Sequence, residues 1–175
     1  MSTEKSSTSD IEVRPAENGG AGAEAQLQDL LPFTIGDRTF AVFVDQVDGT
    51  AEHKPFATLP RAPHAVIGVV CVRGRMLTVL DPTVVLDPHE PAWESSLPYV
   101  IVLRGEEQLA LAAETCHDTI TISATDIEDS PDGDGTDADI AVGLVRYAGQ
   151  EMLILDSGRL FSRAVQRRER RRRRF

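Results

Sequence analysis

Short apolar runs separated by glycine, proline and acidic residues make up most of the hydrophobic pattern of the chain. Runs of this length, bounded by turn-forming residues, are typical of β-strands rather than helices. The pattern predicts strands that open at residues 31–33 and 97–99 and occupy 39–44, 47–56 (broken at Gly49), 99–103, 109–113 and 119–122. Turns are expected at Gly36-Asp37 and Gly105-Glu106, so both halves of the chain begin with a similar hairpin.

Residues 59–86 carry the densest pattern in the chain. Two prolines at their start favour extended backbone, and Gly68 is expected to form a turn. The apolar residues 69–72 then predict a strand buried on both faces.

A tight hairpin is expected to follow this strand. Gly74 can adopt a positive φ at little steric cost, and the return strand 76–80 should end at Asp81-Pro82. Arg73 would then be a lone cation at the hairpin tip. It is either a functional residue or a solvated turn residue, since exposed charged residues are common in turns.

The hairpin pattern occurs twice. Glycine, glycine and aspartate follow one another at intervals of six and seven residues in both halves of the chain, at Gly68, Gly74, Asp81 and again at Gly143, Gly149, Asp156. Self-similarity of this kind indicates a duplicated β unit. After the second copy, Asp156 or Ser157 can cap a final helix, with an apolar face formed by Leu160, Phe161, Ala164 and Val165.

Composition agrees with a β-rich core. The chain has 175 residues, 41% of them hydrophobic and only 5% aromatic, so the core must depend on aliphatic side chains. No apolar run approaches the roughly 20 residues that span a bilayer, and the polar N-terminus lacks the features of a signal peptide. We therefore expect a cytoplasmic protein without membrane insertion. Residues 1–28 are expected to form a disordered leader before the folded domain.

Charge is distributed unevenly. The net charge is −10, but residues 167–175 contain seven arginines and one glutamate, which leaves −16 on the first 166 residues. An acidic body argues against nucleic-acid binding. The basic tail, 166–175, is open to three interpretations: a solvated helix end attracted to the acidic body, a contact with an anionic membrane or nucleic acid, or a tether for an acidic partner.

Candidate chemistry is sparse. Cys71 and Cys116 lack metal-site spacing and are expected to be buried thiols. The four histidines, His53, His64, His89 and His117, are scattered, and no nucleophile, phosphate-loop or dinucleotide motif occurs. Residues 132–139 are rich in aspartate but do not match the spacing of a calcium-binding loop. The sequence thus predicts a binding module rather than an enzyme, with no metal and no cofactor.

The segment Leu59-Pro60-Arg61-Ala62-Pro63, followed by residues 68–74 and Leu80-Asp81, resembles the signature of the CheW coupling-protein family. The resemblance extends over about residues 31–161. Three positions depart from the family pattern: Cys71 replaces an asparagine, Thr83 stands where an arginine is frequent, and Gly49 stands where known members carry a glutamate that can pair with the hairpin arginine.

This resemblance implies an all-β fold of two intertwined five-stranded SH3-like barrels with a short C-terminal helix. The CheW-like domain would cover 29–165, with barrels at about 31–90 and 97–161. The implied function is a non-enzymatic adaptor that couples chemoreceptor cytoplasmic tips to the regulatory domain of a CheA-type histidine kinase. The implied contact residues are Arg73, Val47, Gly74 and Asp81. The pathway, flagellar or type IV pilus, stays open, and a small-ligand or metal-binding β-barrel is the alternative.

Overall fold

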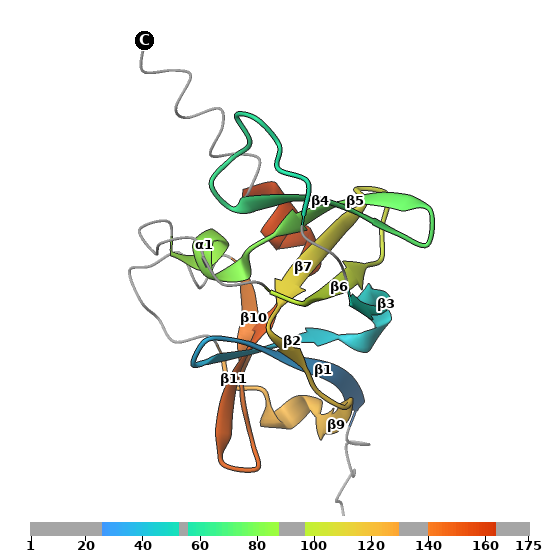
Figure 1. The fold of residues 1–175 in the computed structure, drawn as a ribbon. Helices are drawn as coiled ribbons and strands as arrows, with labels where there is room; N and C mark the ends of the chain where they lie inside the picture. Colours follow the sequence, from blue (N-terminus) through green and yellow to red (C-terminus); the bar gives the residue numbers. More distant parts are fainter. Residues whose placement is uncertain (1–25, 53–55, 88–96, 130–139, 164–175) are drawn as a thin grey trace, which may run out of the picture.

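The computed structural model describes residues 26–52, 56–87, 97–129 and 140–163 (Figure 1). The acidic loop, the basic tail 166–175 and nearly all of the predicted leader lie outside these residues, so those predictions stay untested. Residues 27 and 28, which were assigned to the leader, already belong to the first strand. No helix in the described ranges is long and apolar enough to cross a membrane.

The described chain is built mainly from strands, as predicted. They are β1 Leu27–Ile35, β2 Arg38–Phe43, β3 Val47–Glu52, β4 Val66–Val72, β5 Arg75–Leu80, β6 Tyr99–Leu103, β7 Leu109–Ala113, β8 Thr115–Cys116, β9 Ile120–Ser123, β10 Ala141–Tyr147 and β11 Gln150–Leu155. Two single-turn 3-10 helices, η1 Val44–Gln46 and η2 Ala124–Asp126, and the short helix α1 Pro82–Leu86 connect some of them. The all-β fold class is therefore confirmed.

Two sheets exchange strands between the halves of the chain (Figure 1). The first has the order β10-β11-β2-β1-β8, with β9 also paired to β1, and the second has the order β3-β6-β7-β5-β4. The opening hairpin of each half thus lies in a sheet whose remaining strands all come from the other half. Neither sheet corresponds to residues 31–90 or 97–161 alone, and the first sheet has six strands rather than five.

Parallel pairing joins the exchanged strands. β11 pairs with β2, and β5 pairs with β7, whereas the other pairs are antiparallel. Successive residues of β1 point to opposite faces. Leu30 therefore packs in one hydrophobic cluster with Ile154, and Leu31 and Phe33 pack in the larger cluster, which draws on both sheets. β1 and β2 of the first sheet consequently form the wall between the two hydrophobic clusters.

The duplicated hairpins have nearly the same backbone. Arg73 and Gly74 form the two-residue turn of the first, with φ values of 49° and 79°. Ala148 and Gly149 form the turn of the second, with φ values of 50° and 80°. Positive φ at both central residues is the geometry that matches the right-handed twist of the flanking strands. The predicted tight turn at Gly74 is confirmed.

Gly68 lies inside β4, so the predicted turn there is wrong. A Cβ atom at this position would come within 2.5 Å of the carbonyl oxygen of Ala57. Ala57 and Val69 exchange two backbone hydrogen bonds of 2.9 and 3.0 Å. Glycine is needed here because a second chain segment crosses the strand at close range, not because the chain reverses.

β4 is an edge strand, and the prediction that it is buried on both faces is wrong. Gly68 is its one buried residue. Cys71 is exposed, so the predicted burial of this thiol is also wrong, while Cys116 is half-buried. A continuous apolar run does not distinguish a central strand from an edge strand whose outer face is apolar.

Asp81 ends β5 and also caps a helix that the sequence did not predict. Its Oδ1 accepts hydrogen bonds from the Thr83 backbone N–H at 2.9 Å and from Thr83 Oγ1 at 2.5 Å. Pro82 occupies the first turn of α1, where its missing N–H costs nothing. Since Asp81 is 0% exposed, the fold holds it inside the protein.

The predicted C-terminal helix is present from residue 157 to the end of the described chain at 163. Asp156 Oδ1 accepts a hydrogen bond from the Arg159 N–H at 3.0 Å, which confirms the predicted cap. Leu160 is fully buried and Phe161 packs against the larger core cluster. Ala164 and Val165, assigned to the same face, lie outside the described residues.

Candidate functional site

The tip of the β4–β5 hairpin presents Arg73 to solvent. Val72 and Arg75 pair across the strands, so Arg73 and Gly74 alone form the connection. Within the described chain, Arg73 makes no hydrogen bond or ion pair. Its φ of 49° lies in the left-handed region, which costs a non-glycine residue about 1–2 kcal/mol.

β3 runs beside this tip and carries Gly49. The register of β3 against β6 shifts between Val47 and Gly49, which marks a bulge, and Gly49 has a φ of 139°. A Cβ atom built on Gly49 would lie 4.0 Å from Arg73 Nη1. The hairpin arginine therefore reaches the position that was singled out from the sequence as lacking a glutamate.

Asp48, the neighbour of Gly49, binds two other arginines. Its Oδ2 lies 3.2 Å from Arg75 Nη1 and its Oδ1 lies 3.1 Å from Arg104 Nε. Hydrogen bonds from Arg104, and then from Arg75, hold the pKa of the Asp48 carboxyl below its usual 3.8. Both carboxylate oxygens are thus engaged away from Arg73.

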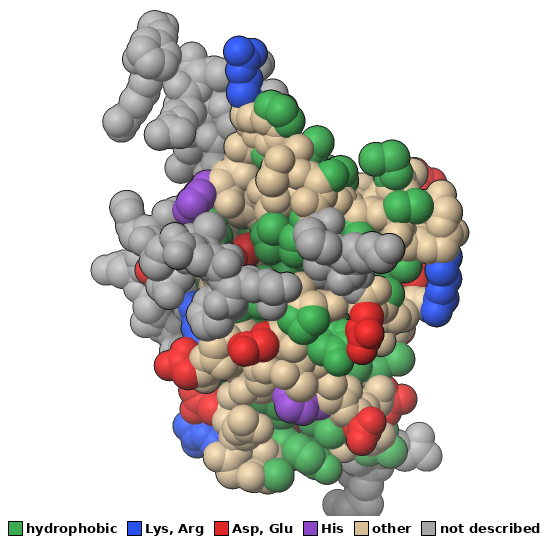
Figure 2. Space-filling model, in the orientation of Figure 1, with side chains coloured by type: hydrophobic (Ala, Val, Ile, Leu, Met, Phe, Trp, Pro, Cys, Tyr) green, Lys and Arg blue, Asp and Glu red, His purple; other side chains and the backbone are tan. Residues whose placement is uncertain are grey.

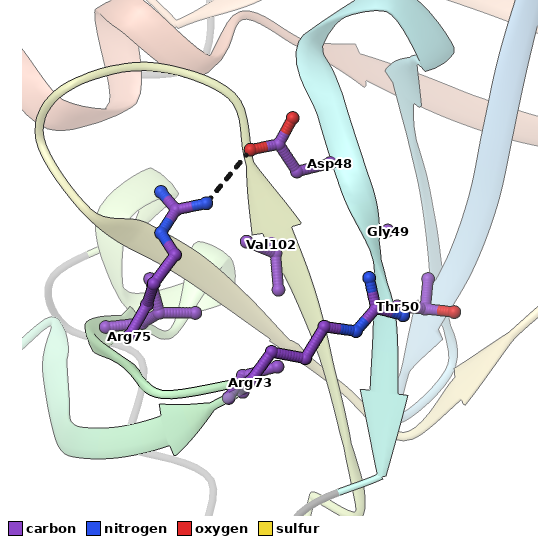
Figure 3. Close-up of a pocket in the computed structure, with 8 residues that line it drawn as sticks. Asp48, Gly49, Thr50, Arg73, Arg75 and Val102 are labelled. Atoms are coloured by element: carbon purple, nitrogen blue, oxygen red, sulfur yellow. Dashed lines mark hydrogen bonds and ion pairs between the residues drawn. The ribbon is translucent and has the colours of Figure 1, made fainter.

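A hollow of about 220 Å³ separates the hairpin from β3 (Figure 3). Its lining combines charged rim residues with an apolar floor: Asp48, Gly49, Thr50, Val72, Arg73, Arg75, Leu77 and Val102. Figure 3 shows the Arg73 side chain crossing toward Gly49 and Thr50, while Arg75 turns to Asp48. This volume is below the roughly 300–1,000 Å³ of small-molecule sites, so the hollow suits a side chain of a partner better than a free ligand.

Val47 and Gly74 also lie near the hollow, but Asp81 is buried elsewhere. Val47 is half-buried, packs against the larger core cluster, and its carbonyl oxygen accepts a 3.3 Å hydrogen bond from Arg104 Nη2. Gly74 forms the turn beside Arg73. Asp81 can influence a partner only through α1 and β5, because its side chain has no exposed surface.

Sequence inspection missed Asp48, Arg75 and Arg104 as parts of this site. Arg75 is 27 residues and Arg104 is 56 residues from Asp48. No local spacing connects such residues; only the assembly of β3, β5 and β6 in the second sheet brings them together. The one available indication was Gly49 itself, which pointed to this part of β3.

An apolar surface lies on the opposite face of the same hairpin. Cys71 and Met76 are directly paired, and Met76 is 62% exposed. Figure 2 shows hydrophobic side chains at the surface over the region where Figure 1 draws β4 and β5. The hairpin thus offers a charged face toward β3 and an apolar face outward.

Metal and catalytic chemistry find little support in the described residues. Nowhere in them do three His, Cys, Asp or Glu side chains gather closely enough to hold a metal ion. His64 and His117 are exposed, whereas His53 and His89 lie outside the described ranges. Burial raises the pKa of the Cys116 thiol to about 11, which suppresses the reactive thiolate.

Comparison with known proteins gives consistent results. Residues 29–165 match the model of the CheW-like domain. The chain is 26% identical over 137 residues to the chemotaxis protein CheW of Rhizobium meliloti, covering 77% of this chain and 87% of the relative. It is 21% identical to the chemotaxis protein CheW of Bacillus subtilis, covering 73% and 83% of the two chains.

The fold has a close counterpart among solved structures. The scaffolding protein TtCheW of Thermoanaerobacter tengcongensis superposes with a TM-score of 0.67 at 17% identity, covering 78% of this chain and 93% of that one. This likeness supports the strand arrangement described above. The domain match over residues 29–165 shows that the chain belongs to the CheW-like domain family, a family of non-enzymatic scaffold proteins.

Proposed function

We propose that the chain is an adaptor that couples the cytoplasmic tips of chemoreceptors to the regulatory domain of a CheA-type histidine kinase. The observation that carries this proposal is the CheW-like domain match over residues 29–165, combined with an exposed, unpaired Arg73 at the hairpin tip of the described chain. Its relatives of similar length are chemotaxis proteins. The adaptor would act in the cytoplasm, where receptor tips and kinase meet.

Arg73 and Val47 are proposed to contact the receptor directly. Arg73 lines the hollow between the β4–β5 hairpin and β3, and Val47 begins β3 next to Asp48, which also lines it. One apolar helix face with a polar flank can dock there. Gly74 would act by fixing the turn that presents Arg73. Asp81 would act indirectly, since it caps α1 from a buried position.

Binding to the two partners can be tested separately. A soluble receptor-tip fragment and an isolated kinase regulatory domain, both from the same genome as this chain, are titrated against the wild type and variants. Arg73→Glu is expected to weaken receptor binding without changing the melting temperature, because an exposed charge contributes little to stability. Val47→Asp should weaken receptor binding more than kinase binding.

Asp81→Ala serves as the control for loss of fold. Removing a cap and leaving buried N–H and O–H groups unpaired costs about 1–2 kcal/mol, so this variant should melt earlier and bind both partners less well in parallel. Equal receptor binding by wild type and Arg73→Glu would refute the role of Arg73. A wild-type chain that binds neither partner would refute the proposed function.

A further inference from the structure

We propose that the hollow beside Gly49 receives a carboxylate from the partner, an aspartate or glutamate on a receptor-tip helix, which pairs with Arg73. This inference rests on the proposed function and specifies the chemistry of the partner. In this chain the arginine's counter-charge would be supplied by the partner rather than by a residue of β3.

The cations around the hollow outnumber the anions. Two arginines, Arg73 and Arg75, line the hollow together with a single carboxylate, Asp48. One Asp48 oxygen binds Arg75, and the other binds Arg104, which lies outside the lining. Arg73 has no ion pair among the described residues, and it does not contribute to the lowered pKa of Asp48. The hollow is thus a locally positive site on a strongly acidic protein, which steers an acidic group toward it.

Gly49 leaves open the place in which such a group would lie. A Cβ atom at this position would be 4.0 Å from Arg73 Nη1, so a longer acidic side chain there would reach the guanidinium. The φ of 139° at Gly49 is strained for any other residue. The backbone of β3 therefore disfavours an internal partner for Arg73 while leaving the space beside it free.

When a receptor helix docks over the hollow, Arg73 needs a carboxylate partner from that helix. Free Arg73 is hydrated, but a helix that covers the hollow removes this water. A buried unpaired guanidinium is strongly unfavourable, whereas one that binds a carboxylate is compensated. The apolar floor of Val72, Leu77 and Val102 excludes water from the pair and strengthens it.

The first experiment fills the hollow from within. Gly49→Glu and Gly49→Gln place side chains of matched size on the same strained backbone, so both carry the same conformational cost. The introduced glutamate should pair with Arg73 and compete with the partner, whereas the introduced glutamine should not. We expect Gly49→Glu to bind the receptor-tip fragment about tenfold more weakly than Gly49→Gln, the effect of one charge-assisted hydrogen bond of about 1.4 kcal/mol.

A second readout needs no partner. In Gly49→Glu, the pKa of the new carboxyl, followed by ¹³C NMR, should lie below the usual value of about 4.3 and return toward it when Arg73→Gln is added. An unshifted pKa would overturn the proposed geometry even if receptor binding is intact. The inference can thus fail while the proposed function stands.

Double-mutant cycles identify the partner group. Each Asp and Glu of the receptor tip is changed to its amide and combined with Arg73→Gln. One acidic residue should couple to Arg73, so that either single change costs about as much affinity as both together. Normal receptor binding by the wild type with no coupled acidic residue would overturn the inference alone. Absence of wild-type receptor binding would overturn the proposed function as well.

Discussion

We predict that any substitution of Gly68 or Gly143 lowers the stability of the fold, because a Cβ atom at either position would clash with a neighbouring backbone segment. A Cβ atom on Gly68 would lie 2.5 Å from the Ala57 carbonyl oxygen, and one on Gly143 would lie 2.5 Å from the Glu128 carbonyl oxygen. Both obstacles are backbone atoms, which cannot move aside as a flexible side chain can. Gly68→Ala must therefore break the contact between Ala57 and Val69.

The magnitude follows from the hydrogen bonds at risk. Ala57 and Val69 exchange bonds of 2.9 and 3.0 Å, and Glu128 and Leu144 exchange two of 2.8 Å. At about 1 kcal/mol for each bond, either alanine variant should lose about 2 kcal/mol of unfolding free energy. For a chain of this size the melting temperature should fall by about 4–8 °C.

Thermal and urea unfolding of three pairs of variants separates this steric cost from a conformational one. Gly74 has a positive φ but no atom within 4 Å of a built Cβ, so Gly74→Asn should be more stable than Gly74→Ala because asparagine tolerates the left-handed region. At Gly68 and Gly143 the order should reverse, with asparagine worse than alanine. Alanine variants at both sites that lie within about 0.5 kcal/mol of the wild type, the usual range of a neutral surface change, would refute the reasoning.

Two further predictions concern titrating groups. Because the folded pKa of Asp48 is depressed, its ion pairs stabilise the fold above pH 3.8 and are lost as the pH falls through the lowered value. Arg104→Gln should raise the Asp48 pKa, as measured by carboxyl ¹³C NMR. An unchanged pKa would contradict the assignment of the Arg104 hydrogen bond as the main cause of the lowered value. With a pKa of about 11, the Cys116 thiol should be ionised in only about one molecule in a thousand at pH 8, so exposed Cys71 should react first with a disulfide reagent. Cys71→Ser should remove the fast phase, and its persistence would contradict the prediction.

The strands and turns were largely predictable because they depend on local pattern. The Asp156 cap, the Gly74 turn and the strands at 99–103 and 109–113 follow from residue types within a few positions of each other. The duplicated hairpin predicted from the repeated glycine and aspartate spacing is also present, since both hairpins share their turn geometry. These features require no knowledge of what packs against them.

The remaining features depend on partners distant in the sequence. The role of Gly68 is set by Ala57 crossing β4, and the exposure of Cys71 is set by the place of β4 at a sheet edge. The ion pairs of Asp48 form only after three strands have assembled around the hollow. Helix α1 was missed because its five residues are too few to show a helical period.

The exchange of strands between the halves has a consequence for biosynthesis. β2 emerges early from the ribosome, but Phe40 must wait for Leu153, near the C-terminal end of the described chain, before its outer edge is paired. Until then β2 exposes unpaired backbone groups that can join the wrong strand. The fold therefore cannot be completed before β11 has been synthesised, and until then the nascent first half is the species most in need of a chaperone.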